Sequence, residues 1–256
     1  MAGLVVACMH GGATPKPGVG GTLALPGEAA PRDKPQGPLK VAFAAPAGSA
    51  AIVSEISVVF DRPVQPLGVV TDAAAPFRLT PATAGAFRWV GSRAVVFTPE
   101  RRLPLATRFE VEVPAGLKAL DGTQLQNAYR FELTTRRPKL VSSLPHNGER
   151  GLAGNTEIRL ELNQSVTPAT LRAAVKLEAK GSRTRDLAFD VVALEKQPRA
   201  LLVKPRQPLP AHSAISLTMA ASLRGSEGPL EAGAAQSLTF HTYEPLALLE
   251  LSCARE

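Results

Sequence analysis

The sequence has little cysteine, few aromatic residues and no long apolar run. Two of its 256 residues are cysteines, and aromatic residues make up 5%. Cys8 and Cys253 lie near opposite ends of the chain, which argues against a disulfide framework or a cysteine metal site. No apolar run reaches the ~18 residues that a membrane helix needs. We therefore expect a soluble chain, apart from any anchor at its start.

The basic charge is not concentrated in any block. The formal net charge is +7 and the sequence pI is about 9.8, values that would suit a nucleic acid or an anionic membrane surface. The closest clusters are Arg101-Arg102, Arg136-Arg137, and Arg183 with Arg185, and no aromatic residues are interleaved with them. We predict that these cations lie on a solvated surface and that the chain has no nucleic-acid partner.

The sequence also lacks a catalytic or metal-binding constellation. It has no Gly-x-Ser-x-Gly elbow and no phosphate-binding P-loop. The four histidines, expected at the surface or at strand ends, are His10, His146, His212 and His241. They have no zinc-site spacing. Glu110 and Glu112 share one strand and should face solvent rather than flank a cleft. We predict a protein that is not an enzyme and needs no cofactor or metal.

What the chain does contain is an internal repeat. The stretch "RAVVFTPERRLPLATRFEVEVPAG", from Arg93, agrees in pattern with "RALLVKPRQPLPAHSAISLTMAAS", from Arg199, 106 residues later. Glu55 aligns with Glu157, 102 residues later, and "YRFELTT" near the end of the first copy aligns with "QSLTFHT". Because the order is kept and the offset drifts by only a few residues, we infer a tandem duplication. Each copy, of about 100 residues, is long enough to fold alone.

Within each copy the apolar residues alternate. Ile56, Val58 and Phe60 are separated by mostly polar residues, with Val59 as the exception, and the same spacing recurs later in both copies. Alternation of this kind is typical of strands with one buried and one wet face. Turn signals such as Asp121-Gly122 separate the strands. Many short strands at this spacing predict a β-sandwich in each copy.

Other residues should mark the ends of these strands. Pro104 and Pro210 cannot donate to a ladder and should precede a long strand. Arg93 and Arg199 should lie at the start of the strand before it, in a structural salt bridge or stacking role. A short helix is expected after Pro168, with Thr167 as its cap.

The start of the chain, "MAGLVVACMHGG", fits a lipobox that ends at Cys8. A Gly- and Pro-rich segment follows and is typical of a flexible tether. We predict lipid attachment at Cys8. Only seven residues precede Cys8, and none is Lys or Arg, so the charged part of a signal peptide is absent from this sequence. A free cysteine in a disordered tail is the alternative.

One segment of the first copy resembles a known family. The segment 87–138 is similar to the bacterial Ig-like domain found near the start of bacterial alpha-2-macroglobulins. The resemblance lies in Trp89, Gly91 and Arg93, in "FTPERRLP", in the Asp-Gly turn and in the closing "FELTT". The second copy lacks the Trp and the Asp-Gly turn, and its end, "FHTYEPLALLELSC", resembles the exit into the next domain of those proteins.

The resemblance implies an all-β chain of two tandem Ig-like β-sandwiches. The implied organisation is a lipobox and tether at 1–38, sandwiches at 39–137 and 138–244, and the start of a further domain at 245–256. It also implies that the chain is the non-catalytic N-terminal module of a broad-range endopeptidase inhibitor, a periplasmic lipoprotein anchored to a membrane of the cell envelope. The module would have a spacing and interdomain packing role, and the bait region and thioester of such inhibitors are absent from this sequence. Its partners would be the remaining domains of that protein and, through regions outside this chain, proteases. The alternative is a stand-alone Ig-like module that binds a protein or glycan of the cell envelope.

Overall fold

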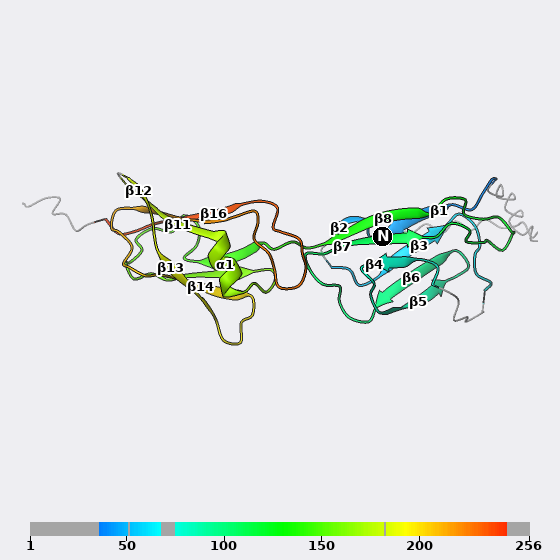
Figure 1. Cartoon of the computed structure of the whole chain (residues 1–256), viewed down its shortest axis with the longest axis horizontal. Helices are drawn as coiled ribbons and strands as arrows, with labels where there is room; N and C mark the ends of the chain where they lie inside the picture. Colours follow the sequence, from blue (N-terminus) through cyan, green and yellow to red (C-terminus); the bar gives the residue numbers. More distant parts are fainter. Residues whose placement is uncertain (1–35, 51, 68–74, 182, 245–256) are drawn as a thin grey trace, which may run out of the picture. The chain divides into compact units, whose positions relative to one another are not determined.

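The computed structural model describes residues 36–50, 52–67, 75–181 and 183–244 (Figure 1). Cys8 with its lipobox and tether, His10, and the segment 245–256 with Cys253 lie outside the described residues. The predictions made for them therefore stay predictions.

The first copy forms two four-stranded sheets, which we call domain 1 (Figure 1). The first sheet contains, in spatial order, β1 (Val41–Ala45), β3 (Ile56–Phe60), β6 (Ala94–Pro99) and β5 (Gly85–Val90). The second contains β2 (Gly48–Ala50), β8 (Tyr129–Thr135), β7 (Arg108–Val113) and β4 (Arg78–Thr80). All neighbours are antiparallel except β2 and β8, which are parallel.

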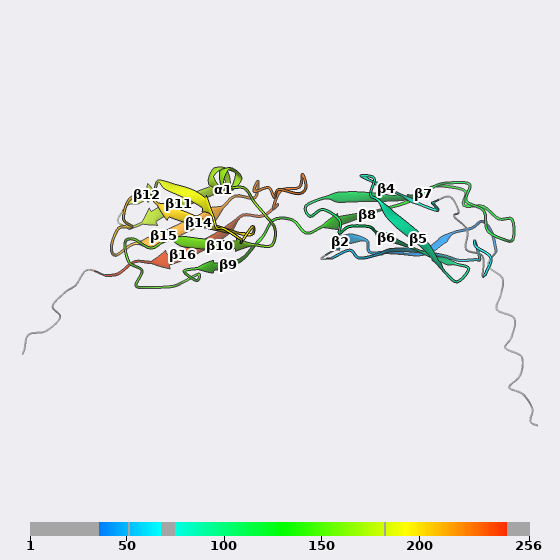
Figure 2. The same cartoon turned by 90° about the horizontal axis from the view of Figure 1, so that it is seen from below.

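The second copy also forms two four-stranded sheets, which we call domain 2 (Figure 2). The first contains β13 (Phe189–Ala193), β14 (Ala200–Pro205), β10 (Ile158–Leu162) and β9 (Leu140–Leu144). The second contains β12 (Thr184–Asp186), β11 (Val175–Lys180), β15 (Ala214–Met219) and β16 (Gln236–His241). One helix, α1 (Pro168–Ala174), leads into β11.

The two domains share one topology. The sheet order β1-β3-β6-β5 of domain 1 reappears as β9-β10-β14-β13 in domain 2. The parallel contact of domain 1 also recurs. In domain 1 Ala50 pairs in parallel with Thr135, and in domain 2 the corresponding residues Leu152 and Thr242 form a parallel bridge. The prediction of tandem β-sandwiches is confirmed.

Each domain has its own apolar core, built from the alternating residues. Ile56, Val58 and Phe60 are at most 1% exposed, while Val59 between them is half-buried, as the alternation predicts. The core of domain 1 is made only of residues between Leu39 and Leu133, and that of domain 2 only of residues between Leu152 and Phe240. Each copy therefore buries its own apolar surface.

Helix α1 is capped as predicted. The Thr167 hydroxyl accepts a hydrogen bond from the Thr170 N–H at 3.1 Å, and Pro168 occupies the first turn, where no N–H is needed. Leu171 is buried, and the guanidinium of Arg172 lies 4.3 Å from the centre of the Phe189 ring, a cation–π contact. Within the described residues no helix has the length and hydropathy to cross a bilayer.

The repeated stretch begins at a β-ladder. Arg93 and Arg199 directly precede β6 and β14, as predicted. Their backbone carbonyls accept hydrogen bonds from the neighbouring strand, at 2.8 Å from Phe60 N–H and 2.9 Å from Leu162 N–H. Both side chains are exposed. The backbone of both arginines therefore has a structural role, and the charge of Arg199 also contributes to lowering the pKa of the Glu227 carboxyl.

The Leu-Pro part of the stretch, residues 103–107, forms a turn that we call the Leu-Pro corner. The hydroxyl of Thr135, at the end of β8 and 3% exposed, donates to the Pro104 carbonyl at 2.7 Å and accepts from the Thr107 N–H at 3.0 Å. Ala106 has a positive φ of 51°, which costs energy for a residue with a Cβ. Its N–H donates to the Arg136 carbonyl at 2.8 Å. The buried hydroxyl thus fastens the corner to the last strand.

Domain 2 rebuilds the same corner at residues 209–213. The hydroxyl of Thr242, 6% exposed, donates to the Pro210 carbonyl at 2.6 Å and accepts from the Ser213 N–H at 3.0 Å. His212 has the same φ, 51°, as Ala106 in domain 1, and its N–H donates to the Tyr243 carbonyl at 2.8 Å. The repeat in the sequence therefore encodes a repeated hydrogen-bonded corner.

We expect Thr135→Val to destabilise domain 1. Valine keeps the shape of the side chain, but the buried Thr107 N–H loses its side-chain acceptor and the Pro104 carbonyl loses its donor. The free energy of unfolding should fall by about 1–3 kcal/mol. Trp89, the one tryptophan of the sequence, packs 6.2 Å from the Phe60 ring, so its fluorescence in a urea titration reports domain 1.

Thr134→Val is the matched control. Thr134 precedes Thr135 on β8, and its side chain points to the opposite, half-buried face. The free energy of unfolding of Thr134→Val should stay within about 0.5 kcal/mol of the wild-type value. Equal shifts for the two variants would contradict a special role for the Thr135 hydroxyl.

Candidate functional site

The described histidines do not gather into one site, although His212 and His241 line the same hollow of domain 2. His146, His212 and His241 lie at the surface or at a strand end, as predicted. Within the described residues, no group of three His, Cys, Asp or Glu side chains is placed to hold a metal ion. Cys8, the predicted lipid site, lies outside the described part of the chain.

The carboxylates of β7 belong to a cross-strand ion-pair network. Glu112 accepts hydrogen bonds from Arg78 on β4 at 2.7 Å and from Arg130 on β8 at 3.0 Å. These bonds hold the pKa of the Glu112 carboxyl below its usual range. Glu110 pairs with the same Arg130 at 3.2 Å. The two carboxylates thus pair across the sheet, which is the arrangement expected of a solvent-facing strand.

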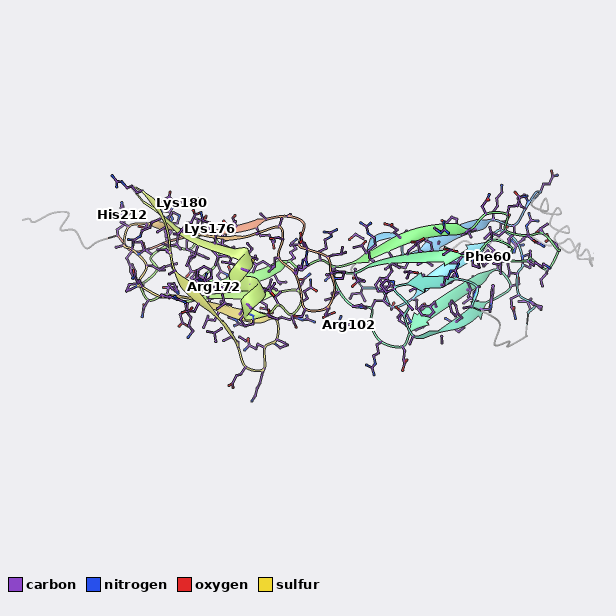
Figure 3. All side chains as sticks on the ribbon, viewed as in Figure 1. Phe60, Arg102, Arg172, Lys176, Lys180 and His212 are labelled. Atoms are coloured by element: carbon purple, nitrogen blue, oxygen red, sulfur yellow. The ribbon has the colours of Figure 1, made fainter. Side chains whose placement is uncertain are left out.

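The most developed polar contact joins the two domains. Glu227 of domain 2 accepts two hydrogen bonds from the Arg102 guanidinium, at 2.6 and 2.7 Å, and a third from the Leu105 N–H at 3.0 Å. The Glu227 side chain is 23% exposed, and Arg102, labelled in Figure 3, is 62% exposed. A two-pronged guanidinium–carboxylate pair fixes orientation as well as charge.

This pairing also shifts the titration of both groups. The hydrogen bonds from Arg102 lower the pKa of the Glu227 carboxyl, and those to Glu227 raise the pKa of Arg102. Because the pKa of the Glu227 carboxyl is lower when the contact is made, the stabilisation by the contact is fully present at pH values above the ordinary pKa of glutamate. It loses this contribution as the pH falls through the lowered value. The contact is therefore fully charged near neutral pH.

The backbone next to Glu227 fits closely against the corner of domain 1. A Cβ on Gly228 would lie 2.2 Å from the Leu105 carbonyl oxygen, 2.5 Å from that of Ala106 and 2.4 Å from the Thr107 hydroxyl oxygen. Only glycine permits this approach. Two residues on, the Leu230 N–H donates to the Ala106 carbonyl at 2.8 Å. The loop 225–230 of domain 2 is therefore seated on the Leu-Pro corner of domain 1.

The seated loop has a counterpart in domain 1. In domain 1 the Leu120 N–H donates to the Pro63 carbonyl at 2.9 Å, and in domain 2 the Ser226 N–H donates to the Ser165 carbonyl at the same distance. These bonds tie corresponding loops to corresponding segments after β3 and β10. The Glu227-Gly228 dipeptide of domain 2 therefore occupies the position that corresponds to the Asp-Gly turn of domain 1.

The acidic residue of this loop has different partners in the two domains. In domain 1, Asp121 accepts a hydrogen bond at 3.0 Å from Arg62, whose side chain is 4% exposed, so the pair stays within the domain. In domain 2 the position of Arg62 is taken by Gln164, which is fully buried and uncharged. Glu227 instead meets Arg102 of domain 1. The change from arginine to glutamine is thus accompanied by a change from an internal ion pair to one between domains.

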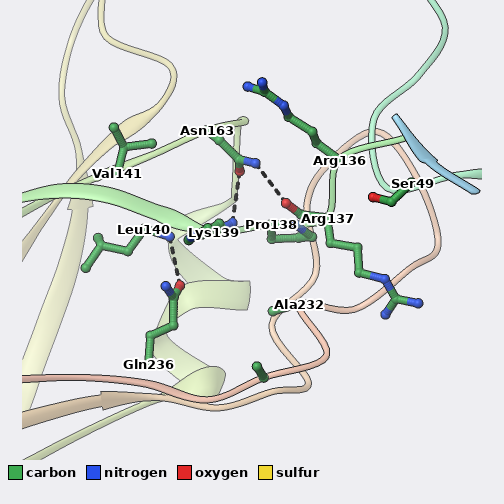
Figure 4. Close-up of a pocket in the computed structure, with 11 residues that line it drawn as sticks. Ser49, Arg136, Arg137, Pro138, Lys139, Leu140, Val141, Asn163, Ala232 and Gln236 are labelled. Atoms are coloured by element: carbon green, nitrogen blue, oxygen red, sulfur yellow. Dashed lines mark hydrogen bonds between the residues drawn. The ribbon is translucent and has the colours of Figure 1, made fainter. Parts of the chain in front are cut away.

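The connection between the domains is also held by side chains of domain 2 (Figure 4). Asn163 accepts from the Lys139 N–H at 2.9 Å and donates to the Arg137 carbonyl at 2.8 Å, and Gln236 accepts from the Leu140 N–H at 2.8 Å. These residues line a hollow of about 700 Å³. The two bonds of Asn163 fix the backbone between the domains at Arg137 and Lys139, and the bond of Gln236 fixes Leu140, the first residue of β9.

Two of the clustered arginines have a role that the sequence did not reveal. Arg102 and Arg137 are exposed, as predicted for a solvated surface. Both, however, bond to domain 2, since Arg137 donates to the Glu231 carbonyl at 3.0 Å while Arg102 holds Glu227. The signal in the sequence was the acidic loop of the second copy, but nothing in the alternation pattern shows that this loop reaches the first.

Both sandwiches match one family. Residues 35–135 and 134–242 each match the bacterial Ig-like domain. The chain belongs to the bacterial Ig-like domain family. The junction is thus a contact between two consecutive domains of this family. A comparison with curated protein sequences gave no match.

Solved structures share only low similarity with these Ig-like domains. The copper resistance protein PcoC from Escherichia coli is 20% identical, with a TM-score of 0.32, covering 41% of this chain and 98% of its own. The segment MG0-NIE-MG1 of alpha-2-macroglobulin from Escherichia coli is 14% identical, with a TM-score of 0.29, covering 79% and 71%. An L,D-transpeptidase from Mycobacterium tuberculosis is 12% identical, with a TM-score of 0.26, covering 80% and 89%.

We expect Gly228→Ala to loosen the junction while leaving both domains folded. The added methyl group collides with backbone carbonyls of the corner, so the loop must withdraw and the ion pair at Glu227 must lengthen. Cleavage by trypsin after Arg136, in the linker, should then become at least about tenfold faster, because cleavage needs the linker to open locally.

Gly181→Ala is the control for this substitution. A Cβ on Gly181 would meet only the Ser213 hydroxyl, at an ordinary 3.6 Å. It should leave the cleavage rate unchanged. If Gly228→Ala cleaves no faster than this control, the seating of the loop does not restrain the linker.

Proposed function

We propose that the chain is a non-catalytic module that spaces and orients other parts of a larger protein of the cell envelope. The observation that carries the proposal is the seating of Gly228 and Glu227 on the corner of domain 1. Fitted backbone and a two-pronged ion pair are suited to fixing one domain on the next. Glu112, a charged residue of the sheets, is paired with arginines of both neighbouring strands.

We further propose that the larger protein is an alpha-2-macroglobulin-like inhibitor of endopeptidases. The support is the sequence resemblance of residues 87–138, and the structure gives its marked residues a place in the fold. Trp89 packs near Phe60, Gly91 turns between β5 and β6 with a φ of 70°, and the Arg93 carbonyl joins the ladder. Such residues identify the domain, while protease trapping would be carried by a bait region outside this chain.

The same proposal includes a location and partners. The chain would be held at a membrane of the cell envelope, in the periplasm, by a lipid on Cys8. Each buried methylene adds about 0.8 kcal/mol, so more than one acyl chain anchors firmly. The partners would be the remaining domains and, through them, proteases; a nucleic-acid partner is not proposed.

The inhibitor proposal is tested by comparing the 256-residue chain with the longest polypeptide that its gene encodes. We expect the chain alone to leave trypsin activity on a protein substrate unchanged, beyond competition as a substrate. The longer polypeptide should reduce that activity by at least about tenfold at molar excess, the extent expected of binding well above its dissociation constant.

Two outcomes would sink this proposal. Inhibition by the 256-residue chain itself would place the activity in the Ig-like domains. A gene that ends at Glu256 would favour the stand-alone module that binds an envelope protein or glycan.

The anchor is tested by metabolic labelling with a palmitate analogue in cells that express the gene with its full upstream signal. The wild-type protein should be labelled and should sediment with membranes, whereas Cys8→Ala should lose both properties. Cys253→Ala is the matched control and should keep both. Label retained in Cys8→Ala would show that the lipid is elsewhere or that the motif is fortuitous.

A further inference from the structure

The corner of domain 2 has the same build as the corner of domain 1 but is not seated by the described residues. In domain 1 the Leu105 N–H and the Ala106 carbonyl are both bonded to domain 2. The corresponding groups are the Ala211 N–H and the His212 carbonyl. Among the residues that the structure describes, no hydrogen bond reaches either group. The backbone that receives a neighbour in domain 1 is thus also formed in domain 2, where no described residue is bonded to it.

The surroundings of the two corners also correspond. A hollow of about 430 Å³ beside the domain 2 corner is lined by Gly151, Tyr243 and Glu244, among others. The matching positions in domain 1 are Ser49, Arg136 and Arg137, and all three line the hollow at the domain junction. Domain 2 therefore carries one half of a second junction.

The side chains beside the corner of domain 2 are exposed. Tyr243, whose ring lies over Gly151, is 58% exposed. The side chains of His212 and Glu244 are 72% and 83% exposed, with 4.0 Å between their closest nitrogen and oxygen. An exposed aromatic ring beside backbone groups that no described residue bonds is typical of a surface that a partner covers.

The charged groups beside the corner of domain 2 differ from those beside the corner of domain 1. The position of Arg102 is taken by Pro208, so no guanidinium is present to hold a carboxylate. The position of Arg137 is taken by Glu244, so a negative charge stands where domain 1 has a positive one. A loop that fits here needs a glycine for close approach and an N–H for the His212 carbonyl. It also needs a basic side chain, rather than an acidic one, for Glu244.

We propose that the corner of domain 2, with Tyr243 and Glu244, is the docking surface for the corresponding loop of a further bacterial Ig-like domain that follows in the same polypeptide. The inference rests on the proposed function, since it needs a longer protein. The sequence continues after Glu244 with Pro245, as domain 1 continues after Arg137 with Pro138. The loop of the further domain carries a glycine at the position of Gly228 and a Lys or Arg directed at Glu244.

The test compares amide hydrogen exchange in the 256-residue chain and in the longer polypeptide that the gene encodes. In the short chain the Leu105 amide should be protected, and the Ala211 amide should exchange at least about tenfold faster. In the longer polypeptide the Ala211 amide should slow to the level of Leu105.

A charge reversal then identifies the surface. Glu244→Lys in the longer polypeptide should return Ala211 to the fast exchange of the short chain. Glu195→Lys, an exposed glutamate in the turn before β14, makes the same charge change and should have no effect. Unchanged melting of the short chain with either substitution excludes a loss of folding as the cause.

The outcomes separate this inference from the proposed function. If a longer polypeptide exists but Ala211 exchanges equally fast in both forms, the docking surface is refuted and the module proposal stands. If Glu195→Lys acts like Glu244→Lys, the surface is assigned wrongly. If no longer polypeptide is made, both proposals fall.

Discussion

A buried threonine hydroxyl at the end of the last strand is the interaction on which the rest of each domain's end depends. In domain 1 the Thr135 hydroxyl ties the corner to β8 by bonding both to Pro104 and to Thr107. The corner can then hold Ala106 with a positive φ and turn its carbonyl outward. A buried hydroxyl that lost these partners would pay a desolvation cost, so the corner and the strand are fixed together. That fixed carbonyl is what domain 2 binds.

Duplication of this domain supplied both sides of the junction. The corner of one copy receives the loop of the next, and the loop is the same structural element in both copies. What differs is the use of one acidic residue. Asp121 is held inside domain 1 by Arg62, whereas Glu227, with the neutral Gln164 behind it, reaches Arg102 of the other domain. The two copies therefore differ at a few loop positions, where one has an internal ion pair and the other a contact between domains, while both cores have the same alternation.

The separation between apolar cores within the domains and polar contacts at their ends is consistent with the proposed spacer module of Ig-like domains. The inward residues of the strands are apolar in both copies, whereas the opposite face differs: Glu110 and Glu112 correspond to the buried Ser216 and the half-buried Thr218. Two copies that keep the same core but differ on the outer face of their strands are expected where selection acts on the fold and the copies share no functional site. The specific chemistry is concentrated at the ends of the domains, where neighbouring domains meet.

The sequence by itself determined the fold class, the duplication, the strands with clear alternation and the capped helix, because alternation, turn residues and caps act over a few neighbouring residues. It also placed Pro104 and Pro210 at their turns. Only the tertiary structure decided what those turns are for. Their bonds to Thr135 and Thr242, and the reach of Glu227 to Arg102, join residues about 30 to 125 positions apart. No local pattern fixes which distant side chains meet, since that depends on how two complete domains present their ends.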